Sequence, residues 1–317
     1  MQNKQLKGTL LVMLGATFWG LGGTVTEKLF TEYHLPVSLF VAERLILSGF
    51  FLLLIAKLIQ KHPLTNIFRV KHSLFQLIIY ALFGMLGVQY TFMATIDKGN
   101  VAIATLLQFL APVVILLYLL ITRKSKFRIT DIIIIVCSLF GTSLLLTNGD
   151  YATLSVPPNA IVWGLLTACA AAFYTVYAVK LFLNWPSLVV IGWSMFIGGI
   201  ALSIINLDFS FPWHLLDVQG VIYFIFVITF GTMFAFWMYL ESVKYISPQT
   251  TALFGVLEPV TAVISSVLWL KVPFGLWQLI GMIVILVVVL YMSVGMKPRR
   301  KNVKKSYKQI NYNKKLG

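Results

Sequence analysis

Three ionisable side chains lie deep inside long apolar stretches of this sequence: Glu43, Arg44 and Glu258. Charged groups in such surroundings are costly, and they are functional candidates by default. Glu258 is followed by Pro259, which has no backbone N–H and so frees a carbonyl one turn earlier, near Gly255. A kinked helix that carries a carboxylate beside a free carbonyl predicts a site for a proton or a cation.

Glu258 has two interpretations. In the functional one, its carboxyl exchanges a coupling proton or pairs with a cationic solute. In the structural one, a neighbouring Tyr or Thr holds the carboxyl in its protonated form.

Arg44 also has two interpretations. It lies about seven residues inside an apolar stretch, where it could bind the carboxylate of a solute. Alternatively, it forms a structural ion pair with Glu43 or Glu27, or bonds to a carbonyl at a helix end. Adjacent residues point about 100° apart on a helix, so Glu43 and Arg44 cannot both face one cavity squarely.

The composition requires these groups to sit in a membrane. Of 317 residues, 59% are apolar and only 11% are charged, whereas an average soluble domain has about 25% charged residues. A hydrocarbon core of about 30 Å needs about 20 apolar helical residues. Ten segments meet this length, at roughly 8–30, 37–58, 74–96, 100–122, 130–147, 160–182, 187–206, 219–241, 247–270 and 274–295. The first is expected to remain as a span, because it is long and lacks an Ala-x-Ala-like cleavage site before Glu27.

The basic residues predict the orientation. With the amino terminus inside, 21 of the 25 Lys and Arg fall on the inner side. Basic residues favour the cytoplasmic side, so we expect a multi-pass protein of the plasma membrane with both termini in the cytoplasm. Nine of them lie in the tail 296–317, which has no acidic residue. We expect this tail to bind anionic membrane lipid, at about 1 kcal/mol per basic residue.

An internal repeat relates the two halves of the chain. A shift of 147 residues aligns 83–139 with 230–286 without a gap, and ten of the 57 positions are identical. Equivalent positions include Phe83-Gly84 with Phe230-Gly231, Pro112-Val113 with Pro259-Val260, and Phe127 with Phe274. At a shift of 155, the run 15–19 aligns with 170–174. Segments 1–5 therefore repeat as segments 6–10. Because five is odd, the second half is inverted, and inverted repeats are typical of secondary transporters with a solute site near the midplane.

The repeat also pairs aromatic residues at matching depths: Trp19 with Tyr174, and Tyr90 with Trp237. Their faces suit an amine or an aromatic solute through cation–π contact, worth up to about 2 kcal/mol when desolvated. The alternative is that they pack or face lipid, as most aromatic residues in this chain must.

Two further features concern the surroundings of Glu258. Gln108 lies one turn before Ala111, the position that mirrors Glu258, and it is a candidate solute ligand. Because Ala111 mirrors Glu258, the Glu258 carboxyl has no acidic counterpart in the first half. The glycines Gly20, Gly22, Gly23, Gly198 and Gly199 favour close helix approach over binding.

Several short runs together resemble the EamA-type proteins of the drug/metabolite transporter superfamily. These are Gly15-Ala-Thr-Phe-Trp-Gly20, Glu43-Arg44-Leu45, Ala111-Pro112-Val113, Glu258-Pro259-Val260 and Leu279-Ile-Gly281. The resemblance covers about 8–295. It implies export of amino acids, amines or other metabolites by alternating access, with proton coupling in some members. One departure is Arg123-Lys124 and Leu270-Lys271, where a Gly-Glu pair is usual.

We therefore expect an all-α membrane protein with ten transmembrane helices in two inverted five-helix repeats. Its expected parts are the cytoplasmic residues 1–7, a first repeat 8–147, an outer linker 148–159, a second repeat 160–295 and the basic tail 296–317. The expected function is secondary active export of small organic metabolites, such as amino acids, amines or drug-like solutes. Uptake of a quaternary amine is an alternative, as is a membrane sensor or scaffold that moves no solute.

No cofactor, metal or nucleic-acid partner is expected, and an enzyme is disfavoured because no catalytic set of side chains falls at one depth. The two cysteines, Cys137 and Cys169, are expected to be small buried apolar residues. The sequence leaves a homodimer open.

Overall fold

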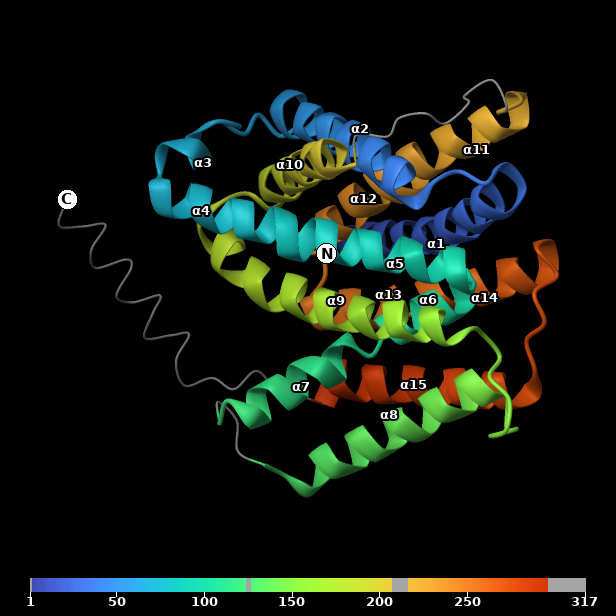
Figure 1. Ribbon diagram of the computed structural model, residues 1–317. Helices are drawn as coiled ribbons and strands as arrows, with labels where there is room; N and C mark the ends of the chain where they lie inside the picture. The colour runs from blue at the N-terminus through green and yellow to red at the C-terminus, as the bar shows by residue number, and fades with distance from the viewer. Residues whose placement is uncertain (1, 124–126, 207–215, 296–317) are drawn as a thin grey trace.

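The computed structural model describes residues 2–123, 127–206 and 216–295, and Figure 1 shows their arrangement. The regular structure of these residues is entirely helical, without a strand. They include ten helical stretches that are long and apolar enough to cross a membrane. The predicted class, an all-α membrane protein with ten spans, is confirmed. The basic tail lies outside the described residues.

The helices follow the predicted spans, with shifted ends and with four spans subdivided. In chain order they are α1 (Gln2–Tyr33), α2 (Val37–Leu58), α3 (Asn66–Arg69), α4 (Lys71–Ile79), the π-helical η1 (Tyr80–Leu86), α5 (Gly87–Lys98), α6 (Val101–Gln108), α7 (Ala111–Ile121), α8 (Ile129–Thr147), α9 (Pro158–Asn184), α10 (Ser187–Ile205), α11 (Val218–Ile228), the π-helical η3 (Thr229–Phe234), α12 (Ala235–Ser242), α13 (Pro248–Gly255), α14 (Leu257–Trp269) and α15 (Leu276–Gly295). Helix α1 continues three residues past its predicted end and stops before His34, whose backbone is left-handed with φ 51.

Proline and a capping carboxylate set several helix starts. Helices α2 and α10 begin directly after Pro36 and Pro186, which occupy the N-cap positions; a residue there precedes the first helical turn, so its missing N–H removes no hydrogen bond of the helix. Helix α11 begins after Asp217, whose carboxylate accepts hydrogen bonds of 2.7 Å from the Gly220 N–H and 2.7 Å from the Tyr33 hydroxyl. These two bonds hold the pKa of the exposed Asp217 carboxyl below its ordinary value.

The third and eighth spans each contain a π-helical stretch at equivalent positions of the repeat. Phe83-Gly84 lies in η1, and Phe230-Gly231, 147 residues later, lies in η3. A π stretch displaces the regular hydrogen-bond ladder, so its carbonyls need partners elsewhere. The shared irregularity shows that the repeat is structural as well as sequential.

The carbonyls at these stretches are covered by the second and seventh spans. The Ser48 hydroxyl of α2 donates to the Ile228 carbonyl at 3.1 Å. At the equivalent place in the first half, the Ala81 carbonyl lies 3.2 Å from the position that a Cβ on Gly198 of α10 would take. Ala81 precedes Ile228 by 147 residues, and Gly198 follows Ser48 by 150. Each of these two helices therefore packs on the π stretch of the other half.

The other contacts between helices show the same symmetry between the two halves. Helix α2 packs on α10 and α8 on α15, each with its own counterpart. Helix α9 packs against α5, α6 and α7, whereas its counterpart α1 packs against α12 and α14. If each helix is replaced by its counterpart in the other half, the same kinds of helix pairs result. The predicted arrangement of two inverted five-helix repeats is confirmed.

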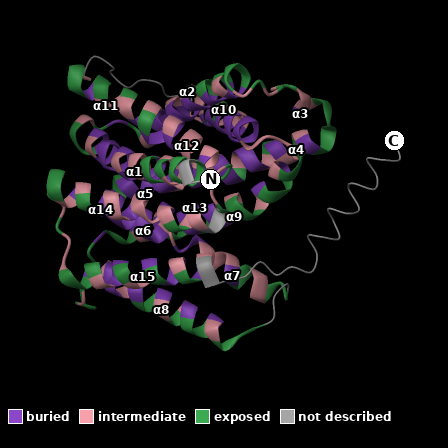
Figure 2. Ribbon diagram, turned by 180° about the vertical axis from the view of Figure 1, so that it is seen from behind, coloured by how far each residue is buried: buried purple, intermediate pink, exposed green. Residues whose placement is uncertain are grey.

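Large apolar side chains cover the outside of the bundle. Buried residues concentrate where the helices face one another, while exposed ones lie on outward sides (Figure 2). Among the exposed apolar residues are Phe83, Leu139 and Ile204, each 66–67% exposed. A soluble protein seldom presents such a surface, so this exterior fits lipid.

Candidate functional site

The fourth and ninth spans are each broken into two short helices at equivalent residues. Helices α6 and α7 are separated at Phe109 and Leu110, and α13 and α14 meet at Val256, which is 147 residues after Phe109. The first segments of the two broken spans even share their caps: the Asn100 side chain accepts from the Ile103 N–H, and Ser247, again 147 residues later, caps α13. Discontinuous membrane helices of this kind form the binding sites of many transporters.

The break corrects the predicted position of Glu258. A continuous ninth helix would place this residue mid-helix, but Glu258 is the second residue of α14. The predicted interruption of the helix before Pro259 is confirmed, because α13 ends at Gly255 and α14 begins at Leu257. The amino terminus of a helix carries a partial positive charge, which favours a carboxylate in the first turn.

The Glu258 carboxyl is partly accessible and makes no hydrogen bond or ion pair with any other residue that the structure describes. Among the described residues, no Tyr or Thr hydroxyl donates to this carboxyl, so the structural interpretation of Glu258 lacks its hydrogen bond in this conformation. A carboxyl inside a membrane bundle that no protein group satisfies is available to a proton, to water or to a solute.

Helix α1 lies directly against the break. A Cβ on Gly20 would come within 2.5 Å of the Glu258 carbonyl oxygen, and one on Gly22 within 2.6 Å of the Gly231 Cα. The predicted role of these glycines in close helix approach is confirmed. Trp19, the neighbour of Gly20, packs against α12, which lies on another side of α1.

Trp19 belongs to an aromatic group near Glu258. Its ring centroid lies 4.9 Å from that of Phe236, edge-on, and 4.9 Å from that of Tyr239. Tyr239 in turn lies beside the break that precedes Glu258. Its hydroxyl would lie 3.6 Å from a Cβ on Gly255, the last residue before the break.

Tyr239 was missed by sequence reasoning. It lies two residues beyond Trp237, which was selected because it mirrors Tyr90. Only the packing of α12 against α1 shows that Tyr239, and not Trp237, faces the break. A polar aromatic residue in the eighth span was the available signal, but nothing in the sequence gives its direction.

The other predicted aromatic residues lie in different surroundings. Tyr174 stacks on Tyr80 with ring centroids 5.2 Å apart, and it also packs beside Ala111, the mirror position of Glu258. Tyr90 meets Trp163 edge-on at 5.8 Å.

Trp237 packs against Phe234 and the buried cluster around α2 and α10. Gln108 is the last residue of α6, partly accessible at the break of the fourth span. Trp19, Tyr174 and Gln108 are therefore near the two breaks, whereas Tyr90 and Trp237 pack on Trp163 and Phe234.

Arg44 is buried, with 5% of its surface exposed. Its guanidinium donates to the Gln89 side-chain carbonyl and to the Met93 sulfur at 3.6 Å, and it lies over the Phe40 ring at 5.9 Å. Within the described residues, no carboxylate is paired with it, so the predicted alternative of an ion pair is wrong for this conformation. Its Nε has no partner there either.

Glu27 is a further buried acid that sequence reasoning placed at the end of a span. Because α1 continues to Tyr33, Glu27 lies inside the bundle with 5% exposure. Its carboxylate accepts a hydrogen bond of 2.8 Å from the Val101 N–H at the start of α6. Glu27 thus holds an otherwise unpaired donor at a helix start, which is a structural role.

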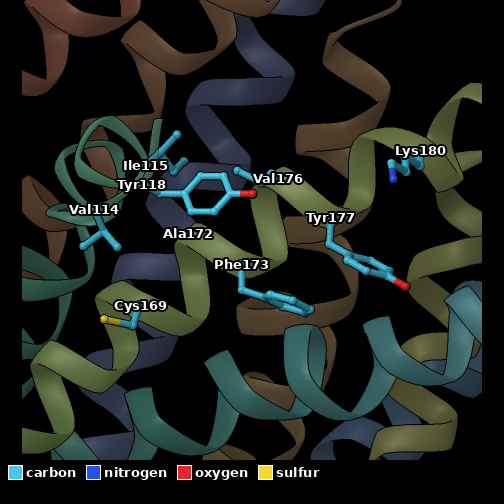
Figure 3. A pocket seen from close by; sticks show the side chains of 9 residues that line it. All are labelled: Val114, Ile115, Tyr118, Cys169, Ala172, Phe173, Val176, Tyr177 and Lys180. Carbon is cyan, nitrogen blue, oxygen red and sulfur yellow. The ribbon is translucent and has the colours of Figure 1, made fainter. Parts of the chain in front are cut away.

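A groove of about 460 Å³ opens between α7 and α9. Val114, Ile115 and Tyr118 line it from α7, and one face of α9 lines it from Cys169 to Lys180 (Figure 3). Cys169 is exposed there, contrary to the expectation that it is buried. We call this feature the α7–α9 groove.

Two inverted repeats, two broken helices and one unpaired carboxyl at a break together define a membrane transporter. The comparisons with known proteins agree. The chain belongs to the EamA-like transporter family, whose model matches residues 6–147 and 158–294.

Individual relatives include two bacterial transporters. An uncharacterized inner membrane transporter, YicL of Salmonella typhimurium, is 30% identical over 92% of this chain and 97% of its own length. The riboflavin transporter ImpX of Fusobacterium nucleatum is 35% identical over 39% of this chain and 42% of its own. A crystal structure described only as that of a protein has a TM-score of 0.60 at 16% identity and covers 95% of this chain and all of that one, which supports the fold.

Proposed function

We propose that this protein is a secondary active carrier that exports small organic solutes, such as amino acids, amines or drug-like molecules, across the plasma membrane. The observation that carries the proposal is the partly accessible Glu258 carboxyl, which no other described residue satisfies, at the break of the ninth span. The inverted repeats supply the motion, because two bundles of similar structure can rock around a site between them.

In this mechanism Glu258 is the coupling group. A proton and a cationic solute compete for the same carboxylate, so that binding of one releases the other. The absence of a fixed protein partner among the described residues leaves the carboxyl free to exchange its proton for a solute. The rings of Trp19 and Tyr239 would contact an ammonium group through cation–π interaction, worth about 0.5–2 kcal/mol.

Arg44 is proposed to bind a solute carboxylate. A buried guanidinium with only a carboxamide and a thioether as partners lacks its counter-charge, and leaving a buried charge uncompensated costs several kcal/mol. A solute that brings a carboxylate to Arg44 would recover part of this cost. An Arg44→Lys protein that inserts and melts normally but no longer transports carboxylate-bearing solutes would support this role. Undiminished transport of those solutes would refute it.

The direction of transport and the orientation of the chain in the membrane are also part of the proposal. The distribution of basic residues supports cytoplasmic termini, and the inner membrane location named for YicL supports the plasma membrane. The basic tail is proposed to bind anionic lipid. Two other solute classes have specific support: a quaternary amine from the aromatic group around Trp19, and a flavin from the named substrate of ImpX.

The test is solute flux through the purified full-length protein in proteoliposomes under an imposed pH gradient. The panel contains amino acids, a primary amine, a quaternary amine and riboflavin. We expect saturable flux of at least one amino acid or amine, which collapses when a protonophore removes the gradient. If thermal melting shows that the protein is folded and yet no solute gives saturable flux, the carrier is refuted and a sensor or scaffold is favoured.

The variant Glu258→Gln tests the site itself. The control is Glu43→Gln, which removes a carboxyl from another span. We expect the first variant to lose gradient-driven flux and its pH dependence, and the second to retain both. Undiminished, pH-independent transport by Glu258→Gln would refute the coupling role.

A further inference from the structure

We propose that the α7–α9 groove binds an anionic membrane phospholipid, with an acyl chain along α9 and the phosphate beside Lys180. This site uses α7, the second half of the broken fourth span, but it lies on the face toward α9, away from Glu258 in the ninth span, and does not depend on which solute the protein carries. Three observations carry the inference: the lining of the groove, its length and the charge at one end.

The lining is mostly apolar apart from the Tyr118 hydroxyl and the Cys169 thiol, and its one charged group, Lys180, lies at one end. Val114 and Ile115 of α7 face Phe173 and Val176 of α9, as Figure 3 shows. The hydroxyl of Tyr177 and the ammonium of Lys180 lie toward the end of α9. An apolar channel with a cationic end suits an amphiphile with an anionic head better than it suits a wholly polar solute.

The length of the groove matches one leaflet. Cys169 and Lys180 are eleven residues apart on α9, which is about 16 Å of helix at 1.5 Å per residue. Half of a hydrocarbon core of about 30 Å is about 15 Å. With Cys169 near the midplane, Lys180 therefore lies at the level of the head groups.

The charge of Lys180 is available to a head group. Among the described residues, the ammonium of Lys180 is paired with no carboxylate. The predicted orientation places this end of α9 at the cytoplasmic leaflet, where anionic lipids concentrate, and each basic residue there is worth about 1 kcal/mol of attraction. That corresponds to about five-fold in affinity.

The experiment measures lipid retention by the full-length protein. The protein is extracted from liposomes of equal phosphatidylglycerol and phosphatidylcholine, and the bound lipids are quantified by mass spectrometry. We expect phosphatidylglycerol to be enriched over the bulk ratio, and Lys180→Gln to lower the enrichment about five-fold. Lys57→Gln, which removes an exposed basic residue predicted on the same side, is the matched control and should change nothing.

A second pair of variants tests the groove itself. Val176→Trp fills the groove from an exposed position, and Val179→Trp adds the same ring to an exposed position of α9 outside the groove. Only the first should release the lipid. The basic tail is present in every variant, so its own lipid binding cancels from each comparison.

Cys169 gives an independent readout. In a Cys137→Ala background it is the sole thiol, and phosphatidylglycerol should slow its reaction with a maleimide more than phosphatidylcholine does. Equal retention of both lipids by wild type, or no difference between Lys180→Gln and Lys57→Gln, would overturn the proposal. Rapid disulfide formation between Cys169 residues of two copies, unaffected by phosphatidylglycerol, would place a second chain in the groove and also overturn it.

Discussion

Replacing Gly20 by alanine tests whether contact between α1 and α14 holds the site in place. The added Cβ would lie 2.5 Å from the Glu258 carbonyl oxygen and 2.9 Å from the Ala262 nitrogen. Both are backbone atoms, which cannot rotate away. An ordinary contact begins at 3.4 Å, so the two helices must separate by about 0.9 Å.

The magnitude follows from that displacement. Overpacking of a well-packed interior costs about 1–3 kcal/mol, so the thermal midpoint should fall. A shift of about 1 Å in a positioned group can cost about 100-fold in rate. We therefore expect Gly20→Ala to lower proteoliposome flux by about 10- to 100-fold, because Glu258 moves with α14.

Gly87→Ala is the matched control. Its Cβ would meet nothing closer than 3.8 Å, the distance to the Ala170 Cβ, although Gly87 also lies in a membrane helix. This variant should keep wild-type flux and gain slightly in stability from the better helix propensity of alanine. If Gly20→Ala transports and melts like wild type, close approach of α1 does not position the site, and the reasoning is refuted.

Three further predictions concern groups that hold the scaffold. Glu27→Ala should lower stability by about 1–3 kcal/mol, because the buried Val101 N–H loses its acceptor, whereas Glu27→Gln keeps an acceptor and should melt near wild type; equal melting of the two would contradict this. Ser48→Ala should cost about 1 kcal/mol by leaving the Ile228 carbonyl unpaired, measured as a lower thermal midpoint, and an unchanged midpoint would mean that the π stretch needs no cover. Because the folded-state pKa of Asp217 is lowered, its stabilisation is present at neutral pH and is lost as the pH falls below about 4. The thermal midpoint of Asp217→Ala should accordingly be lower at pH 7 and depend less on pH in that acidic range; parallel pH profiles would count against it.

The scaffold is symmetric, but its charged groups are not. Glu258 is mirrored by Ala111 across the repeat, and Arg44 by Ser194, which follows it by 150 residues. The symmetric parts are the helix breaks and the π stretches, which serve the backbone. The side chains that could bind a proton or a solute are placed in only one half each, so the two sides of the site have different chemistry.

Most of the fold was predictable from the sequence. Ten apolar stretches and the offset of 147 residues predicted the spans and their inversion, because crossing a membrane requires about 20 apolar residues in a helix whatever the neighbours are. Pro259 likewise predicted an interrupted helix, since a missing N–H acts locally.

The composition of the site depended on tertiary contacts. The sequence selected Glu258, Arg44 and Trp19 by residue type and depth, but it also selected Trp237, and it missed Tyr239. Which aromatic side chain faces the break depends on how α12 is rotated against α1. Helix packing sets that rotation, and hydropathy in a uniformly apolar span carries no information about it.

The sequence by itself thus determined that the chain crosses the membrane ten times in two inverted halves, and that its few buried charges include Glu258. The tertiary structure alone decided that Arg44 has Gln89 and no acid as its partner, that Glu27 caps α6, and that the carboxyl of Glu258 has no protein partner. The physical reason is range. Burial in lipid and helix breaking act on each residue through its own segment, whereas a partner for a buried charge comes from another helix.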